Sequence, residues 1–416
     1  MPLAINSQNK IIIAGGGLIG PFLALILKRA GFDVELYEKN LDIRSDLEGQ
    51  GRSINLVLTS RGIHALKSVD LWETIKNITI PVSGRIMHSV SGELTYQPYG
   101  KKGQCNYSIS RLELNKRLLT VAENAGVKIY FNFEFQSLDE KNKIAYFNNG
   151  KKKVSFDVLL GADGSGSNVR KEIVRLTNCH DETEWLNVCY KELLMPESPS
   201  GEYALEKNAL HIWPRGKHML MALPNPDKTF TMTLYLPFDD DQLSFKKLNT
   251  IDKIKTYFND FHKDSISLMP NYVDDFLNNP EGKLGTVRCS NWIYKDQVAL
   301  IGDAAHGVVP FFGQGANAGF EGSMTFLNCI KNAENWESAL SNYFKVQKPN
   351  GDAIADMAIE NYYEMADKVR DAKFLYKKQI EQFLFDKLPD TFQSRYGMVV
   401  YTLIPYSDAK RIGKIQ

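Results

Sequence analysis

The chain has 416 residues, 43% of them hydrophobic, so it can bury a large core, and its length predicts two or three domains. Its 50 Lys and Arg residues balance 49 Asp and Glu residues, which argues against nucleic acid or an anionic membrane surface as a partner. The five cysteines lie too far apart along the chain for a zinc or dithiol motif, and this favours a reducing, cytoplasmic setting.

The start of the chain shows no pattern of a secretion signal. MPLAINSQNK leads directly into an apolar strand, which leaves no room for a basic region, an apolar stretch and a cleavage site. The longest apolar runs stop well short of the roughly 20 residues of a membrane-spanning helix. We therefore expect no membrane segment in this chain.

Residues 10–40 are predicted to form a strand, a glycine turn, a helix and a second strand. Gly15, Gly17 and Gly20 have the spacing Gly-x-Gly-x-x-Gly, which suits a tight turn, close approach of a pyrophosphate to the backbone, and packing of helix on strand. Glu38 ends the second strand, where a carboxylate can accept hydrogen bonds from ribose hydroxyls. The unit predicts a dinucleotide site; the alternative is a structural turn followed by an exposed glutamate.

Two later segments repeat this layout of strand, turn and helix. The turn carries Asp163 in KVSFDVLLGADGSGSNVRKEIV, and it carries Gly302 and Asp303 in QVALIGDAAHGVVPFFGQGANAGF. Asp303 can accept hydrogen bonds from ribityl hydroxyls, and the amides of the helix after Gly315 can meet a flavin edge or a phosphate as partial positive charges. An isolated Gly-Asp pair would be an ordinary turn. Because the three turns lie far apart in sequence, we expect them to converge on one sheet.

Together these motifs resemble the three signatures of the single-component flavoprotein aromatic hydroxylases. The matching residues are Gly15-Gly16-Gly17-Leu18-Ile19-Gly20, Asp163-Gly164 and Gly302-Asp303-Ala304-Ala305-His306, in the order of that family. The resemblance implies that FAD is bound, that NADPH visits transiently to reduce it, and that oxygen passes to an aromatic ring from a flavin C4a-hydroperoxide. Only one glycine-triplet unit is present, and in that family a second dinucleotide-binding domain is normally missing.

The predicted fold class is α/β, with a Rossmann-type FAD-binding domain, an inserted antiparallel β-sheet substrate domain and a C-terminal helical region. Aromatic and β-branched runs in 203–238 predict the inserted sheet, to which the similar stretch 78–100 can contribute strands, and the pattern after Ser338 is helical. The predicted bounds are 1–75, 100–180 and 285–335 for the discontinuous FAD-binding domain, 76–99 and 181–284 for the substrate domain, and 336–416 for the helical domain that caps the active site.

Further segments resemble those members of the family that hydroxylate L-kynurenine to 3-hydroxykynurenine. They are GRSINL, RIMHS, PYG, SISR, LHIWPR, PFFGQG and NYYEM. The resemblance implies that Arg85 and Tyr99 hold the substrate carboxylate, with Asn361 and Tyr406 completing the polar contacts, and a guanidinium does present a planar fork to a carboxylate. It also implies an apolar wall around the substrate ring, made of Phe311, Phe312, Leu223, Met221 and Tyr235. The alternatives are a surface arginine and ordinary core packing.

The resemblance implies a set of cofactor contacts as well. They are Gly15, Gly17, Ile19, Gly20, Glu38, Lys39, Asn40, Arg52, Val57, Arg111, Phe135, Asp163, Gly302, Asp303, Gly315, Ala316 and Asn317. Arg111 would offset the charge of the pyrophosphate or the isoalloxazine. The chain departs from the family at Ala316, where methionine is usual, and at Gly322, where the second residue of an acidic pair is usual. The pocket beside the ring is therefore expected to differ in shape. No metal and no side-chain catalyst are expected.

The expected partners are L-kynurenine, NADPH and O2, and a homodimer is the expected assembly. Three alternatives remain open. One is a flavin hydroxylase acting on an anthranilate-like or hydroxybenzoate-like acid, the second is a non-catalytic flavoprotein, and the third is an FAD reductase with a lipid-like substrate. The last would need a long apolar channel in place of Arg85 and Tyr99.

Overall fold

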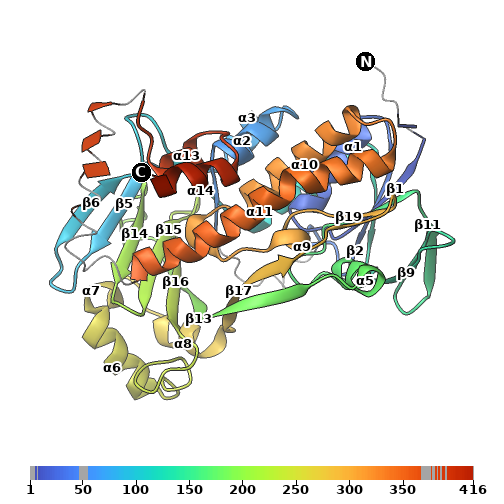
Figure 1. Ribbon diagram of the computed structural model, residues 1–416. Helices are drawn as coiled ribbons and strands as arrows, with labels where there is room; N and C mark the ends of the chain where they lie inside the picture. The colour runs from blue at the N-terminus through green and yellow to red at the C-terminus, as the bar shows by residue number, and fades with distance from the viewer. Residues whose placement is uncertain are drawn as a thin grey trace.

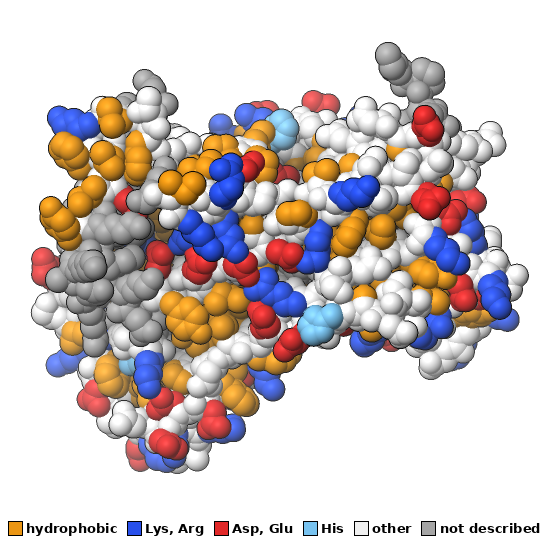
Figure 2. Space-filling model, viewed as in Figure 1, with side chains coloured by type: hydrophobic (Ala, Val, Ile, Leu, Met, Phe, Trp, Pro, Cys, Tyr) orange, Lys and Arg blue, Asp and Glu red, His pale blue; other side chains and the backbone are white. Residues whose placement is uncertain are grey.

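The computed structural model describes residues 5, 6, 8–45, 55–366 and 391–415, together with 376, 380, 381, 383, 384, 387 and 388. The predicted cofactor residue Arg52 lies outside these positions. Figure 1 shows two lobes, each built on a β-sheet, with the long helix α11 (Trp336–Ala366) running across both. Figure 2 shows acidic and basic side chains mixed over the described part of one face, as the balanced composition leads one to expect.

The first lobe is organised around a six-stranded sheet in the order β18-β19-β12-β1-β2-β8. Its strands are β1 (Lys10–Ala14), β2 (Asp33–Glu38), β8 (Lys128–Phe131), β12 (Val158–Gly161), β18 (Ile293–Tyr294) and β19 (Val298–Leu300). β1 pairs in parallel with β2 and β12, and β12 pairs in parallel with β19. The three predicted strand-to-helix turns therefore meet at one sheet, as expected, and at the carboxyl ends of its strands.

Helices and two small sheets surround this sheet. The helices are α1 (Ile19–Arg29), α2 (Ser60–Lys67), α3 (Trp72–Lys76), α4 (Arg111–Asn124), α5 (Asn168–Thr177), α9 (Asp303–His306) and α10 (Gly315–Lys331). One small sheet joins β3 (Leu56–Leu58), β7 (Asn106–Ile109) and β4 (Ile80–Val82), and the other joins β11 (Lys152–Ser155), β10 (Ile144–Phe147) and β9 (Phe135–Asp139). The apolar strand β1 and helix α1 are almost wholly buried, so the local hydrophobic pattern predicted them well.

The second lobe is a seven-stranded sheet in the order β17-β13-β16-β15-β14-β5-β6. Its strands are β5 (Gly84–His88), β6 (Leu94–Pro98), β13 (Asp181–Met195), β14 (Ala209–Pro214), β15 (Met219–Pro224), β16 (Phe230–Pro237) and β17 (Gly282–Cys289). Strands from 78–100 do join this sheet. The sheet is antiparallel as predicted except that β5 pairs in parallel with β14, because a long connection and not a hairpin brings these two strands together.

Three helices in the second lobe were not predicted from the sequence: α6 (Ile251–Phe261), α7 (Lys263–Ile266) and α8 (Tyr272–Asn278). Side chains of α6 and α8 pack in one core with Leu220, Met232 and Leu234 of the sheet. The predicted domain bounds stay predictions, although β17 continues to Cys289, beyond residue 284, and β4 pairs with β7 in the first lobe. The sheet thus has one face covered by helices and one face free to line a cavity.

The C-terminal region is helical in the part that the structure describes. Besides α11 it contains α13 (Arg395–Tyr401) and α14 (Tyr406–Ile415). These helices and the short 3-10 helix η1 (Pro310–Phe312) share a third core with Tyr235 of β16. Among the described helices, none combines the length and the apolar character that crossing a bilayer requires.

A group of buried histidines lies in the second lobe. His88 Nε2 lies 2.9 Å from His211 Nδ1, the His88 ring stacks on Trp213 with centroids 3.9 Å apart, and Asp264 Oδ2 lies 3.5 Å from His88 Nδ1. Arg215 donates to the carbonyl of His88. Burial first, and then the charge of His211, lowers the pKa of His88 to about 4.

The free energy of unfolding is expected to fall as the pH decreases through this group's range. His88 takes up a proton at about pH 6.5 in the unfolded chain but only near pH 4 in the folded protein, so stability present above pH 6.5 is lost between these values. The loss is up to about 1.4 kcal/mol per pH unit for one such group. His88→Phe keeps an aromatic ring stacked on Trp213 but removes the titrating group. The free energy of unfolding of this variant, measured in urea at pH 7 and pH 5, is expected to change less with pH than that of the wild type. The exposed His180 is the control position, and an equal pH dependence of His88→Phe and His180→Gln would contradict the assignment.

Candidate active site

A cavity of about 640 Å³ runs along the carboxyl ends of β1, β2 and β12 and reaches the open face of the second sheet. At one end it is lined by Glu38, Lys39 and Phe135, and at the other by Tyr235 and Phe311. The cavity therefore joins the predicted cofactor turns to the predicted substrate wall.

The glycine turn between β1 and α1 is shaped by two close approaches of backbone to backbone. Gly15 has φ +108°, and an added Cβ there would lie 2.3 Å from the carbonyl oxygen of Ala162. A Cβ at Gly20 would lie 1.9 Å from the carbonyl oxygen of Gly15. A Cβ at Gly17, in contrast, would meet no protein atom within 4 Å. The turn thus leaves open space over Gly17, beside an α1 N-terminus that no side chain caps.

Glu38 is fixed at the edge of this turn. Its Oε2 accepts a hydrogen bond from the Gly16 amide (2.6 Å), and its Oε1 accepts from the backbone and side-chain nitrogens of Asn40 (2.8 and 2.7 Å). Three donors hold the carboxylate in one orientation at the cavity wall, and a carboxylate has further lone pairs for hydroxyl donors. This arrangement suits a ribose.

Asp163 has a second role that the sequence analysis did not predict. Its Oδ1 accepts from the Ser167 hydroxyl (2.5 Å), and its Oδ2 accepts from the amides of Asn168 (2.8 Å) and Val169 (3.2 Å). The carboxylate therefore caps the N-terminus of α5, although it also lines the cavity. Burial raises the pKa of this group, while the hydrogen bond from Ser167 acts in the opposite direction.

The N-terminus of α10 forms a second uncapped set of amides at the cavity. Gln314 precedes the helix without a side-chain cap, and Gly315 and Ala316 line the cavity together with Asp303. Asn317 is fully buried and lies behind them: its Nδ2 donates to the carbonyls of Val57 (2.8 Å) and Gly313 (2.9 Å), and its Oδ1 accepts from the Thr59 amide (2.9 Å). Asn317 thus holds the α10 N-terminus against β3.

Most of the predicted cofactor residues line the cavity. They are Gly15, Gly17, Ile19, Glu38, Lys39, Asn40, Val57, Arg111, Phe135, Asp163, Asp303, Gly315 and Ala316. Gly20, Gly302 and Asn317 do not line it. The two glycines shape the backbone around it, with Gly302 at φ +66° in the third turn, and Asn317 holds that backbone through its side-chain amide. Two uncapped helix N-termini, a fixed carboxylate and the open space over Gly17 fit FAD, whose phosphates and flavin edge need such donors.

The alternation of β15 and β16 separates cavity residues from core residues. Met221 and Leu223 of β15 and Tyr235 of β16 line the cavity, whereas Leu220 and Leu234 point into the core under the helices. Phe311 and Phe312 of η1 close the cavity from the other side. The structure therefore brings together all five residues predicted for the apolar wall.

Only some of the residues predicted to bind the substrate carboxylate lie at the cavity. Tyr99 lines the cavity, but Arg85 and Asn361 do not. Arg85 Nε donates to Gln97 Oε1 (2.7 Å), and Asn361 Nδ2 donates to the carbonyl of Phe311 (2.7 Å), so Asn361 holds η1 in place.

Tyr406 lies elsewhere than predicted, and Tyr396, which the sequence analysis missed, occupies the cavity wall. Tyr406 is fully buried, and its hydroxyl donates to Gln314 Oε1 (2.8 Å). The Tyr396 ring stacks on Tyr99 (centroids 5.5 Å apart) and on Phe312 (5.7 Å) and lines the cavity. Both tyrosines lie in the first turn of a C-terminal helix, so the sequence pattern does not separate them.

The charge of Arg85 affects the pKa of both tyrosines that line the cavity, Tyr99 and Tyr396. Burial raises the pKa of Tyr99, and it raises that of Tyr396 to about 12, while the Arg85 guanidinium acts in the opposite direction on each. Both hydroxyls therefore stay protonated at neutral pH and can donate hydrogen bonds. Among the described residues, no three His, Cys, Asp or Glu side chains come together in a way that could hold a metal ion.

Comparison with known proteins agrees with this geometry. The FAD binding domain family matches residues 8–343. The kynurenine 3-monooxygenases of Flavobacterium johnsoniae and Flavobacterium psychrophilum are 40% and 39% identical to the chain, each over 99% of it and 93% of the relative. That of Dictyostelium discoideum is 38% identical over 99% of the chain and 92% of the relative.

Solved structures share the fold at lower identity. The tetrameric form of 2-methyl-3-hydroxypyridine-5-carboxylic acid oxygenase has a TM-score of 0.71 and 20% identity, covering 86% of this chain and 91% of that one. PqsL of P. aeruginosa, solved in complex with 2-aminobenzoylacetate, has a TM-score of 0.71 and 20% identity, covering 88% and 99%. These likenesses establish the fold of the flavin hydroxylases. The full-length relatives go further, and the chain belongs to the kynurenine 3-monooxygenase family of FAD-binding proteins.

Proposed function

We propose that this chain hydroxylates L-kynurenine to 3-hydroxykynurenine and water, with FAD as its cofactor and NADPH and O2 as co-substrates. The observation that carries the proposal is the single cavity that joins a cofactor cradle to an aromatic wall ending at Tyr99 and Tyr396. The names of relatives that match nearly the whole chain support the same substrate.

The side chains of the chain bind, orient and shield. The Arg85 guanidinium turns from Gln97 to the amino-acid carboxylate, and the protonated hydroxyls of Tyr99 and Tyr396 donate to the same group. Phe311 and Met221 hold the aromatic ring and exclude water from it. FAD would supply the oxygen chemistry when bound at this cradle, with NADPH as the reductant. The ring amino group of the substrate activates the neighbouring carbon, so no acid or base of the protein is needed.

The test is NADPH consumption by the FAD-loaded protein with and without L-kynurenine, with the product identified by mass. We expect L-kynurenine to accelerate NADPH oxidation and to gain one oxygen atom per NADPH consumed. Anthranilate and 4-hydroxybenzoate serve as the comparison substrates. Hydroxylation of either one in preference to L-kynurenine would replace the proposal with its nearest alternative, for which the small Ala316 side chain at the cavity is the structural argument.

We also propose a reducing, cytoplasmic location. The thiols of Cys179 and Cys289 are both free and both donate to the carbonyl of Asn291 (3.9 and 3.0 Å). Two thiols so close stay unlinked where glutathione keeps them reduced. Because Cys289 is buried, cells are lysed directly into denaturant with an alkylating reagent, which is expected to label both thiols, and a disulfide between them would contradict the location. The homodimer remains a prediction, which light scattering checks.

A further inference from the structure

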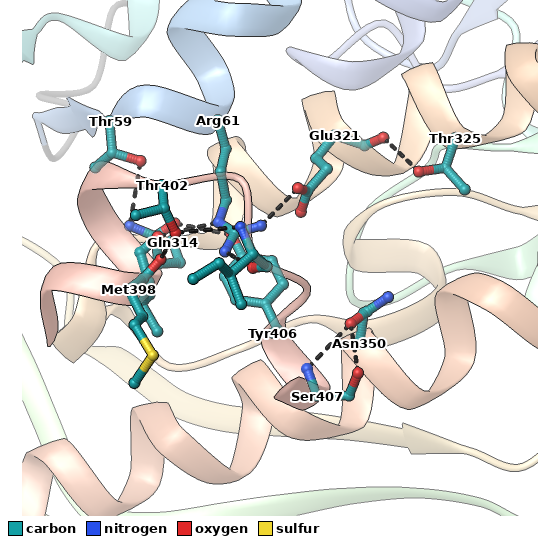
Figure 3. A network of polar contacts seen from close by, with 12 residues as sticks. Thr59, Arg61, Gln314, Glu321, Thr325, Asn350, Met398, Thr402, Tyr406 and Ser407 are labelled. Atoms are coloured by element: carbon teal, nitrogen blue, oxygen red, sulfur yellow. Dashed lines mark hydrogen bonds and ion pairs between the residues drawn. The ribbon is translucent and has the colours of Figure 1, made fainter. Parts of the chain in front are cut away.

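Arg61 of α2 is a fully buried arginine that joins four separate parts of the chain. Its Nη1 donates to Glu321 Oε1 of α10 (2.5 Å), its Nε donates to the carbonyl of Val399 (3.0 Å), and its Nη2 donates to the carbonyl of Ile404. Its guanidinium lies 3.9 Å from the centre of the Tyr406 ring. Figure 3 shows this network, in which the guanidinium lies at the centre.

One arm of the network leads to the substrate end of the cavity. Val399 lies on α13, one turn after Tyr396, and it is wholly buried. Thr402 stabilises the C-terminal end of the same helix, because its hydroxyl donates a hydrogen bond to the Met398 carbonyl (2.5 Å). α13 is a short helix, so its orientation depends on these anchors more than on its own hydrogen bonds. The bond from Arg61 therefore fixes the direction in which Tyr396 faces the cavity.

The other arm leads to the cofactor end. The Tyr406 ring packs on Arg61, and its hydroxyl donates to Gln314 Oε1 (2.8 Å), whose Nε2 in turn donates to the Thr59 hydroxyl (3.4 Å). Gln314 directly precedes the α10 amides at Gly315 and Ala316 that line the cavity. A shift of Gln314 would move those amides with it.

We propose that Arg61 is a positioning residue that holds the substrate-facing helix α13 and the cofactor-facing N-terminus of α10 in register across the cavity. A lysine could keep the ion pair with Glu321 but not the planar set of donors that reaches Val399, Ile404 and Glu321 together. Tyr406, which the sequence analysis assigned to the substrate, belongs to this network. The substrate arm of the inference rests on the proposed function, whereas the cofactor arm does not.

Three variants separate the two arms from general loosening of the C-terminal helices. Tyr406→Phe removes only the hydroxyl that bonds Gln314, and Arg61→Lys disturbs both arms. Ser407→Ala is the matched control: it removes the hydroxyl that bonds Asn350 Oδ1 (3.0 Å) and keeps the backbone amide that bonds the same atom (3.1 Å), so it weakens the contact of α14 with α11 without touching either arm. Four quantities are measured for each purified protein: the dissociation constant of FAD from the apoprotein, the absorption maxima of the bound flavin, the dissociation constant of L-kynurenine from the FAD-loaded protein, and Tm.

Tyr406→Phe is expected to weaken FAD binding about three- to ten-fold, to shift the flavin absorption and to leave the dissociation constant of L-kynurenine unchanged. Arg61→Lys is expected to weaken both ligands by about ten-fold or more. Ser407→Ala is expected to lower Tm alone. A fall in Tm for Arg61→Lys with both dissociation constants unchanged would make Arg61 merely structural and overturn the inference.

The same set of variants still tests the inference in two further cases. If Arg61→Lys does not fold, the inference stands or falls on whether Tyr406→Phe changes FAD affinity and Ser407→Ala does not. If the wild-type protein does not bind L-kynurenine, the proposed function fails, and the FAD dissociation constant of Tyr406→Phe still confirms or contradicts the role of the network at the cofactor end.

Discussion

Gly15→Ala is expected to abolish tight FAD binding and to destabilise the first lobe. The new Cβ would lie 2.3 Å from the Ala162 carbonyl oxygen, and the residue would have to keep φ +108°. Neither can be relieved by turning a side chain, because the opposing atoms belong to the backbone between β12 and α5. We expect a loss on the order of 3 kcal/mol in the free energy of unfolding, measured on the apoprotein by urea unfolding, and no retention of flavin on purification.

Gly17→Ala is the matched control, since it adds the same methyl group two residues further on. Its Cβ would meet no protein atom within 4 Å, so the Tm of the apoprotein should stay unchanged. The methyl group would instead occupy the space left for the pyrophosphate, and FAD affinity should fall about 100-fold. Normal FAD affinity of Gly17→Ala would show that the phosphates lie away from this turn.

Arg85→Ala is expected to raise the KM for L-kynurenine steeply while FAD content stays nearly unchanged. Arg85 lies on β5, away from the cofactor end, and its charge acts on the two phenols that line the substrate end. Loss of one partner of a desolvated ion pair costs about 2 to 5 kcal/mol, which corresponds to a change of roughly 30- to 4000-fold in kcat/KM.

Gln97→Ala tests the same arrangement from the other side. It removes the acceptor that holds Arg85 Nε at 2.7 Å but leaves the charge in place. Its effect on KM should therefore be far smaller than that of Arg85→Ala. Steady-state kinetics of the two variants, with flavin content measured by absorbance, check this order, and an unchanged kcat/KM in Arg85→Ala would remove the residue from the site.

Local patterns predicted the elements whose neighbours lie close in sequence. The apolar run of β1, the glycine turn and α1 follow one another directly, so periodicity and turn chemistry were enough. Helix α6 was missed although Ile254, Tyr257 and Phe258 have helical spacing, because strand-like segments precede it. The helical pattern of α6 was present in the sequence, but the strand-like segments before it favoured a strand prediction for this region. The parallel pair of β5 and β14 carries no local signal at all.

The residues of the site divide in the same way, into those that local sequence identifies and those that depend on tertiary packing. The glycines and the apolar wall were found, since their chemistry depends on residue type. Asp163 was predicted as a cofactor contact and does line the cavity, but its additional role at the N-terminus of α5 was missed, although Ser167 a few residues later is a residue type typical of a helix start. The choice between Tyr396 and Tyr406 depends on how α13 and α14 dock, and Arg61 of α2 contacts both helices through the Val399 carbonyl and the Tyr406 ring.

The parallel pairing of β5 with β14 has a consequence for the order in which the second sheet assembles during synthesis. The hairpin of β5 and β6 leaves the ribosome long before β14, and the second sheet is complete only when β17 has paired with β13. Until β14 has been made, the β5 edge of the hairpin stays unpaired, and non-local pairing of this kind slows folding. Arg85 is thus synthesised early, yet it reaches its final neighbours only after α13, near the end of the chain, has docked.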